Sequence, residues 1–238
     1  NTGTGLFMIT GLASGDVLVK PFCEGIEETV HLNVYTTPHG RNRIIDIIGD
    51  LGGFAFEDYD SECENSFANE NGDRYITCLN ADLTLSDPEY IVATPRGNWT
   101  GKTKGGLILS KDCGSTWERL PMPRGLSEFI DKKLDNIEKP NVDSGWTAIS
   151  ADGKRIMWAV AGGRGFSNKA VCYTDDEGKT WQKSIFTDSS GNSADEHNVK
   201  IFSDYYNSDL FFAIAERGNL GLYISRDKGA TFREVSIK

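Results

Sequence analysis

The chain has 238 residues, of which 38% are hydrophobic, and a formal net charge of -10 at pH 7. This length and apolar content are enough for one large domain with its own core. The acidic balance argues against nucleic acids and anionic membranes as partners, because phosphates are bound by clustered Lys and Arg and the sequence has no such cluster. No stretch approaches the roughly 20 apolar residues that cross a bilayer. We therefore expect a soluble protein that binds neither nucleic acid nor membrane, and for which a neutral polymer is an acceptable ligand.

Alternating apolar residues, separated by Gly, Asn, Asp and Pro, predict short β-strands from the N-terminus onward. Residues 1–20 contain two of them, Leu6–Thr10 and Val17–Lys20, which we interpret as the end of a preceding sheet unit. Residues 25–74 follow as a fuller unit. Its predicted strands are Thr29–Tyr35, Ile44–Ile48 and Phe54–Asp58, joined by the turn Pro38–Asn42 and the loop Gly49–Gly53.

Three further units, residues 75–122, 145–186 and 197–238, repeat one succession of strand, tight turn, strand, long loop and strand. The predicted strands are Asp82–Leu85, Tyr90–Thr94 and Leu107–Ser110, then Trp146–Ser150, Arg155–Val160 and Ala170–Thr174, then Val199–Ser203, Leu210–Ala215 and Leu222–Ser225. Repetition of one supersecondary unit is typical of propellers and solenoids.

Each of these three units ends in the motif S/T-x-D-x-G-x-T-W/F, at Ser110–Trp117, Thr174–Trp181 and Ser225–Phe232. The motif predicts a hairpin turn in which Asp accepts backbone hydrogen bonds, Gly has a positive φ, and the aromatic ring packs beneath. It resembles the Asp-box of sialidase-type propellers. We therefore expect its aspartates to be structural, not catalytic.

The units predict an all-β fold, a β-propeller with Asp-box repeats and about four to five blades. An open stack of blades would expose apolar sheet faces and an unpaired edge. We therefore expect the remaining blades to lie outside this sequence, with a small closed propeller as the alternative.

The loops between second and third strands are expected to rim one face of the propeller, which makes that face the candidate ligand site. Asp50 lies in the first of these loops, between glycines that allow backbone and substrate to approach closely. Trp99, Arg164 and Phe166 lie in the equivalent loops. On spacing alone, Asp50 is either a functional carboxylate or a turn residue.

A resemblance favours the functional interpretation. The runs Gly25–Thr29 (GIEET) and Ile47–Phe54 (IIGDLGGF), together with the repeated motif, resemble the C-terminal propeller of glycoside hydrolase family 74, in order over nearly all of the chain. That family contains xyloglucan endo-hydrolases and oligoxyloglucan reducing-end-specific cellobiohydrolases. Its members have two seven-bladed propellers with the substrate cleft between them, and each propeller supplies one catalytic Asp.

The resemblance implies that Asp50 is the general acid of an inverting hydrolase that cleaves β-1,4-glucan backbones such as xyloglucan. The general base would be an Asp in an N-terminal propeller, which this sequence does not contain, so the chain alone is expected to be catalytically incomplete. We expect substrate contacts from Gly52, Gly53, Trp99, Arg164 and Phe166. The expected protein is secreted and needs no cofactor.

Several other residues have two interpretations. Asp46 lies on the same strand side as Asp50 and is either a group that tunes it or a hydrogen-bonded structural carboxyl. Trp99 is either a sugar-stacking platform or a loop anchor. Cys63 and Cys78 bracket a loop and are either a disulfide pair or free thiols. The acidic loop Glu57–Asp73 favours a solvated surface over calcium binding, since it lacks EF-hand spacing.

The remaining predictions concern the other tryptophans and the possibility of a metal site. Trp146 and Trp158 are expected in the core, and Trp117 and Trp181 in the repeated turns. No metal site is predicted, because Cys and His show no metal-ligand spacing.

Two other functions stay open. A non-catalytic propeller, acting as a receptor domain or carbohydrate-binding scaffold, would have no reason to carry Gly49–Phe54. A sialidase would grip a substrate carboxylate with arginines, for which Arg96, Arg164 and Arg217 lie in suitable loops.

Overall fold

The computed structural model describes residues 17–19, 32–36, 44–49, 51–58, 60–63, 65–123, 145–160, 171–194, 197–216 and 220–236. Within these ranges the regular elements are all β-strands, grouped in four sheets. No helix in the described part of the chain is long and apolar enough to cross a membrane. The all-β partial propeller predicted from the sequence is confirmed.

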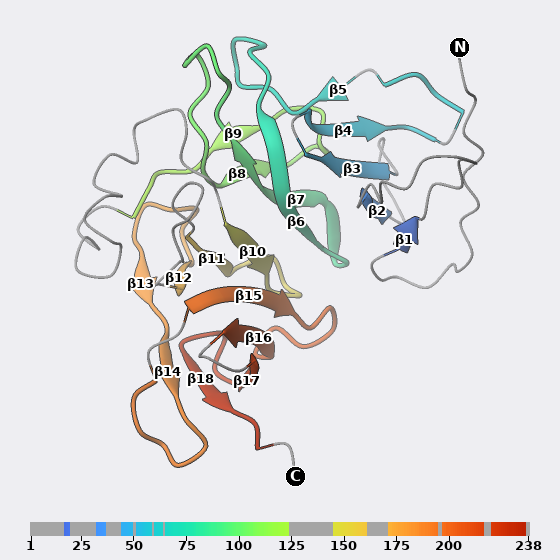
Figure 1. Ribbon diagram of the computed structural model, residues 1–238. Helices are drawn as coiled ribbons and strands as arrows, with labels where there is room; N and C mark the ends of the chain where they lie inside the picture. Colours follow the sequence, from blue (N-terminus) through green and yellow to red (C-terminus); the bar gives the residue numbers. More distant parts are fainter. Residues whose placement is uncertain are drawn as a thin grey trace, which may run out of the picture.

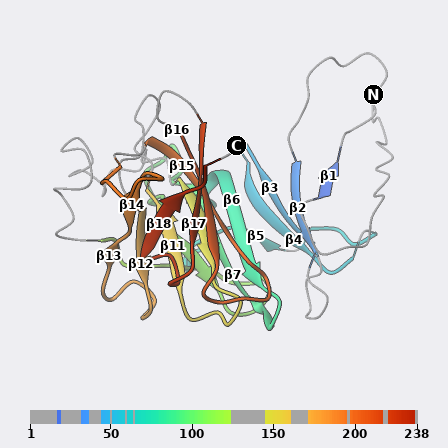
Figure 2. The ribbon, with the colours of Figure 1, turned by 90° about the horizontal axis from the view of Figure 1, so that it is seen from below.

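The four sheets follow one another in chain order along an arc (Figures 1 and 2). Sheet 1 contains β1 (Val17–Val19), β2 (Leu32–Thr36), β3 (Ile44–Ile48), β4 (Gly52–Phe56) and β5 (Asn65–Ser66). Sheet 2 contains β6 (Ile76–Thr84), β7 (Asp87–Arg96), β8 (Ile108–Ser110) and β9 (Glu118–Arg119). Sheet 3 contains β10 (Trp146–Ile149), β11 (Ile156–Ala159), β12 (Val171–Thr174) and β13 (Gln182–Lys183). Sheet 4 contains β14 (Ile185–Thr187), β15 (His197–Ser203), β16 (Phe211–Glu216), β17 (Leu220–Ser225) and β18 (Thr231–Glu234).

Apolar clusters fill the spaces between successive sheets, and alternate residues of one strand serve two clusters. On β7, Ile91 faces sheet 1 while Val92 faces sheet 3. On β11, Trp158 faces sheet 2 and Met157 faces sheet 4. Because side chains alternate along a strand, a sheet that is covered on both faces is apolar at every position. This explains the unbroken apolar run at Ile156–Val160.

The three repeated motifs form the same turn. In the first, the Asp112 carboxylate accepts hydrogen bonds from the Thr116 backbone N–H at 2.8 Å and the Thr116 hydroxyl at 2.6 Å. The Ser110 hydroxyl donates to Asp112 and accepts from the N–H of Gly114, whose φ is 79°. The equivalent contacts recur around Asp176 and Asp227. The turn geometry predicted from the motif is therefore confirmed.

Two of the three turns pack on the sheet that precedes them. A Cβ added at Gly114 would lie 2.9 Å from Ile45 of sheet 1, and one at Gly229 would lie 2.2 Å from Met157 of sheet 3. The glycine is therefore required by the neighbouring blade as well as by the positive φ. The motif thus fixes a turn and a contact between sheets at once.

Two strands pair differently from the sequence prediction. β1 pairs with β2 within sheet 1, although Val17–Lys20 was assigned to a preceding unit. β14 pairs in parallel with β18 of sheet 4, although residues 185 and 186 were placed in the unit before it. Apolar alternation identifies a strand but does not determine its partner, and a short linking strand can add to either neighbouring sheet.

Candidate functional site

The connections of each sheet divide between its two ends, because neighbouring strands are antiparallel. The β6–β7 and β10–β11 turns lie at one end, where Ser86 bonds the carbonyl of Ala151. The repeated turns share that end, since Arg155 donates to the carbonyl of Lys228. The connections that carry Asp50 and Trp99 lie at the opposite end.

Asp50 itself lies outside the described residues, but the residues that flank it are described. The last paired residues of the hairpin are Ile48 on β3 and Gly52 on β4, so Gly49 to Leu51 form the connection. Leu51 is 58% exposed, and a Cβ added at Gly49 would meet nothing within 4 Å. The loop is thus shorter than predicted, because β4 begins at Gly52 and not at Phe54.

Gly52 and Gly53 are buried under the segment that follows β5. A Cβ at Gly52, where φ is +88°, would lie 2.6 Å from the carbonyl oxygen of Tyr75, and one at Gly53 would lie 2.5 Å from the Phe67 ring. The Phe67 N–H also donates to the Gly53 carbonyl at 2.8 Å. The close backbone approach predicted for these glycines is confirmed. Their contact with substrate stays a prediction.

Asp46 is a buried carboxyl at the middle of β3, paired across the sheet with Phe54. Its Oδ1 has no hydrogen-bond partner among the described residues, so the hydrogen-bonded structural role predicted for it is not supported at that atom. Desolvation by burial raises the pKa of Asp46 to about 6. Sheet 1 therefore holds a carboxyl whose charge depends on pH near neutrality.

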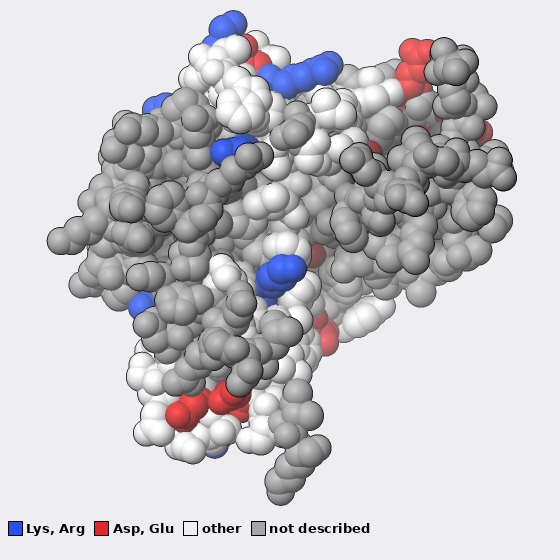
Figure 3. All heavy atoms as spheres, in the orientation of Figure 1, with Lys and Arg blue, Asp and Glu red and all other residues white. Residues whose placement is uncertain are grey.

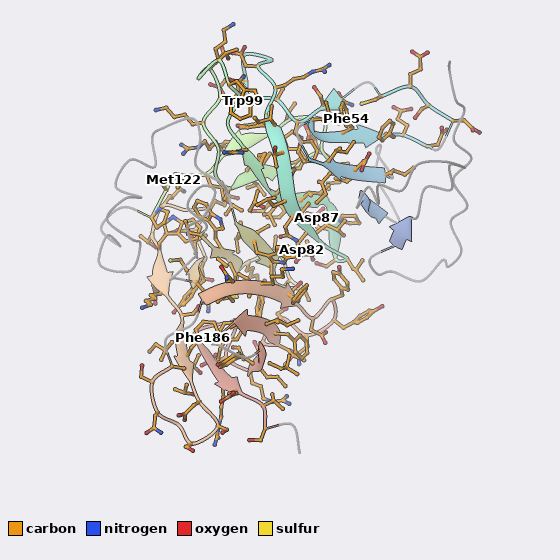
Figure 4. All side chains as sticks on the ribbon, viewed as in Figure 1. Phe54, Asp82, Asp87, Trp99, Met122 and Phe186 are labelled. Carbon is orange, nitrogen blue, oxygen red and sulfur yellow. The ribbon has the colours of Figure 1, made fainter. Side chains whose placement is uncertain are left out.

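Trp99 is 69% exposed on the β7–β8 connection, at the top of the view in Figure 4. The Arg96 guanidinium carbon lies 5.6 Å from the centre of its ring. An indole this exposed does not anchor its loop. That role belongs to Asn98 and to the buried Thr103, whose hydroxyls and amides bond within the loop and to Arg74.

The aspartates of the repeated turns differ electrostatically from Asp46. For Asp112, partial burial acts to raise the pKa, but hydrogen bonds from Thr116 and Ser110 outweigh it and hold the pKa below the usual value. The pKa values of Asp176 and Asp227 are lowered as well. These groups are ionised at neutral pH and lie at the end away from the β3–β4 connection, which agrees with a structural role.

The other predictions concern residues of the remaining loops, one disulfide and a metal site. Arg164, Phe166 and Arg217 lie outside the described residues. The disulfide between Cys63 and Cys78 is absent, since both are free thiols and Cys78 is buried. In the described ranges, no three His, Cys, Asp or Glu side chains group as metal ligands would.

The four tryptophans other than Trp99 divide as predicted. Trp158 is fully buried and Trp117 is 5% exposed. Trp181 packs against the cluster between sheets 2 and 3, and its indole N–H donates to the carbonyl of Pro121. Trp146 packs against the cluster between sheets 3 and 4.

Sequence reasoning missed Asn98, Phe67 and Tyr75. Asn98-Trp99-Thr100 matches a glycosylation sequon, whereas Asn98 with Gly101 at the fourth position also matches a β-turn. The turn is formed, since the Gly101 N–H donates to the Asn98 carbonyl. Phe67 lies within the acidic loop and Tyr75 just after it, yet both are buried.

Comparison with known proteins agrees with this architecture. No family model matches the chain. The xyloglucanase Xgh74A of Acetivibrio thermocellus is 25% identical over 222 residues, which are 93% of this chain and 22% of that protein. The GH74 xyloglucanase of Xanthomonas campestris superposes with a TM-score of 0.63 at 22% identity, over 90% of this chain and 26% of that one. In fold, the chain is a partial β-propeller similar to those of glycoside hydrolase family 74 proteins.

A second family 74 structure shows the same similarity of fold. The GH74 enzyme of Niastella koreensis superposes with a TM-score of 0.60 at 20% identity, over 90% of this chain and 25% of that one. The chain thus spans about a quarter of the length of these family 74 proteins.

Proposed function

We propose that this propeller is part of a glycoside hydrolase that cleaves the β-1,4-glucan backbone of xyloglucan. The observation that carries the proposal is the sequence match to a xyloglucanase over 93% of the chain. The hairpin of β3 and β4 supports it, because that hairpin presents Gly49 to Leu51 at the loop-bearing end, away from the structural aspartates.

In the proposed mechanism, Asp50 is the general acid that protonates the leaving glycosidic oxygen. A base Asp in an N-terminal propeller activates water on the opposite side of the sugar, so the anomeric configuration inverts. Such carboxyl pairs are about 6.5–9.5 Å apart, which leaves room for the water. This propeller would take the C-terminal position, and the two propellers would enclose the substrate between them.

Some residues of this chain would hold the general acid in place, and others would contact the substrate. Packing of Phe67 and Tyr75 against Gly53 and Gly52 fixes the base of the hairpin, and a fixed acid loses little entropy when it reaches the substrate. Trp99, Arg164 and Phe166, with the two glycines, are the proposed substrate contacts. An extracellular location follows from the proposal, since polymeric xyloglucan is found outside cells.

The test is hydrolysis of xyloglucan by the full-length protein, comparing wild type with Asp50→Asn. A general acid is dispensable when the leaving group is already a weak base. We therefore expect Asp50→Asn to lose about 10²–10⁴-fold in kcat on xyloglucan but far less on an aryl glycoside with a dinitrophenolate leaving group. Asp87→Asn is the matched control, because Asp87 is exposed at the start of β7, next to the β6–β7 turn and away from the β7–β8 connection.

Equal losses on both substrates would mean that Asp50 is not the acid. Unchanged activity of Asp50→Asn would make it a turn residue. If the wild type hydrolyses no glucan, the chain is better explained as a carbohydrate-binding scaffold.

A further inference from the structure

We propose that Asn98 is a positioning residue that holds the Trp99 indole as a pre-formed stacking surface for a pyranose ring of a neutral β-glucan. The choice of polymer rests on the function proposed above. The positioning itself rests on the contacts of the β7–β8 connection, which are independent of Asp50.

Asn98 uses its side-chain and main-chain polar groups to close the turn that carries Trp99. Its Oδ1 accepts from the Thr100 hydroxyl at 2.7 Å and from the backbone N–H groups of Lys102 and Thr103 at 3.2 and 3.4 Å. Its own N–H donates to the Thr103 hydroxyl at 2.8 Å. The side chain and the backbone N–H of Asn98 thus bind the residues that follow Trp99 and close the turn.

The turn is also fixed to the neighbouring connection. The Asn98 Nδ2 donates to the Arg74 carbonyl at 3.1 Å, and the buried Thr103 hydroxyl donates to the same carbonyl at 3.2 Å. Lys102 pairs with Asp73 at 3.5 Å, a contact between exposed groups that adds little. Two hydrogen bonds on one backbone oxygen therefore set where the Trp99 turn sits relative to the segment before β6.

That segment in turn contacts the hairpin of Asp50. Tyr75, which follows Arg74, places its carbonyl oxygen against Gly52, and Phe67 covers Gly53. The Tyr75 N–H donates to the Phe67 carbonyl at 2.9 Å, which ties the two contacts together. Packed and hydrogen-bonded groups thus run continuously from the β3–β4 hairpin to Asn98, so the two connections are held as one body.

The Trp99 indole contributes little to the stability of the fold. An indole that is 69% exposed leaves most of its apolar surface in water, whereas tryptophans elsewhere in this chain are buried or packed against a core cluster. Arg96 lies near the Trp99 ring, but most of the indole surface stays exposed to solvent. Large exposed aromatics on a rigid loop fit ligand stacking, because the flat ring loses little entropy on binding. A neutral pyranose is the favoured ligand, since its C–H groups pack on an aromatic face without requiring a counter-charge.

The basic side chains nearby do not change this choice. Lys and Arg side chains lie over the β5–β6 and β7–β8 connections in Figure 3. Lys102 faces Asp73, and Arg96 faces the indole, so these two charges have partners within the protein. A strongly anionic sugar would compete with those contacts.

The test is a double-mutant cycle in the full-length protein made in bacteria, where the sequon carries no glycan. Binding of xyloglucan oligosaccharides is measured by calorimetry in the Asp50→Asn background, in which turnover is slow. We expect Trp99→Ala and Asn98→Ala each to raise the Kd by up to about tenfold, which is the effect expected from the loss of one aromatic contact. Because Asn98 acts through Trp99, adding Asn98→Ala to Trp99→Ala should change Kd no further. Lys104→Gln, an exposed neighbour, should leave Kd unchanged.

Asn98→Asp tests the contact to Arg74 separately, since it keeps the Oδ1 acceptor but replaces the Nδ2 donor with an oxygen that the Arg74 carbonyl repels. In the enzyme with Asp50 intact, it should raise KM on xyloglucan and leave kcat on the dinitrophenyl glycoside unchanged. Equal weakening by Asn98→Ala with and without Trp99, or an unchanged Kd for Trp99→Ala, would overturn the proposal. Absence of hydrolysis with intact, Trp99-dependent binding would overturn only the proposed enzyme.

Discussion

Asp82 on β6 accepts a hydrogen bond of 2.9 Å from the hydroxyl of Ser203 on β15, although β10 lies between these two strands. The same oxygen, Oδ2, accepts from the backbone N–H of Ile149 on β10, also at 2.9 Å. One buried carboxylate therefore joins the first long strands of sheets 2, 3 and 4. Asn80 adds a parallel contact, because its Oδ1 accepts from the Thr147 N–H at 2.7 Å.

Replacing Asp82 with Ala should strongly destabilise the protein. The substitution leaves the buried N–H of Ile149 and the hydroxyl of Ser203 without this acceptor, at a cost of about 2–4 kcal/mol in the free energy of unfolding. Urea unfolding measures the change, and Asp87→Asn is the exposed control on the same hairpin. Stabilities of Asp82→Ala and wild type that agree within error would mean that the sheets are held by their apolar clusters alone.

The Asp112 turn should depend on acid in the opposite direction from a buried carboxyl. Hydrogen bonds to the carboxylate lower its pKa in the folded state, so its stabilisation is complete above the unfolded pKa near 3.8 and disappears as the pH falls through the lower folded value. Asp112→Asn keeps one acceptor but loses the bond from the Thr116 hydroxyl, with an expected cost of about 1 kcal/mol at pH 7.

Urea unfolding of wild type and Asp112→Asn between pH 7 and pH 3 tests this. The two stabilities should converge on the acid side. A gap that stays constant down to pH 3 would show that the carboxylate charge contributes nothing to the turn.

The repeated turns were predictable from the sequence because the determining residues are local. Ser110, Asp112, Gly114 and Thr116 contact one another within seven residues, so their types and spacing determine the turn. The strands were predictable for a similar reason, since apolar alternation records which faces are buried.

Features that depend on a distant partner were not predicted. Asp82 reads as one polar residue on a strand, and nothing near it reveals that its partners are Ile149 and Ser203. Phe67 lies among acidic residues that favour a solvated loop, yet it fills the space left by Gly53. The parallel pairing of β14 with β18 likewise depends on how sheets 3 and 4 are placed.

Gly53→Ala should disturb the Asp50 hairpin through Phe67. The added Cβ would lie 2.5 Å from the Phe67 ring, a distance that forces the ring or the strand to move. Such overpacking costs about 1–3 kcal/mol. Thermal unfolding measures the loss, and Gly49→Ala is the matched control because its Cβ would meet nothing within 4 Å. Phe67→Leu should recover part of the loss in Gly53→Ala. A double variant no more stable than Gly53→Ala would mean that the clash is relieved elsewhere.

Asp46→Asn should stabilise the protein at neutral pH and have no such effect in acid. Burial raises the pKa of Asp46 from 3.8 to about 6, so the folded state holds its proton more tightly than the unfolded chain. The stability of the wild type therefore falls as the pH rises from about 4 to about 6 and stays reduced above that range. A shift of this size corresponds to a gain on the order of 2 to 3 kcal/mol for the variant at pH 8.

The measurement is the difference in unfolding free energy between wild type and Asp46→Asn across pH 4 to 8, with Asp87→Asn as the exposed control. The difference should grow through the titration range of Asp46 and then level off. A variant that is less stable than wild type at pH 8 would mean that the ionised carboxylate has a favourable partner and that burial does not dominate its energetics. Because Asp46 lies four residues before Asp50 on the same hairpin, the pH–rate profile on xyloglucan should be recorded for the same variant. A shift in the acidic limb of this profile would show that the charge on Asp46 changes the pKa of the proposed general acid.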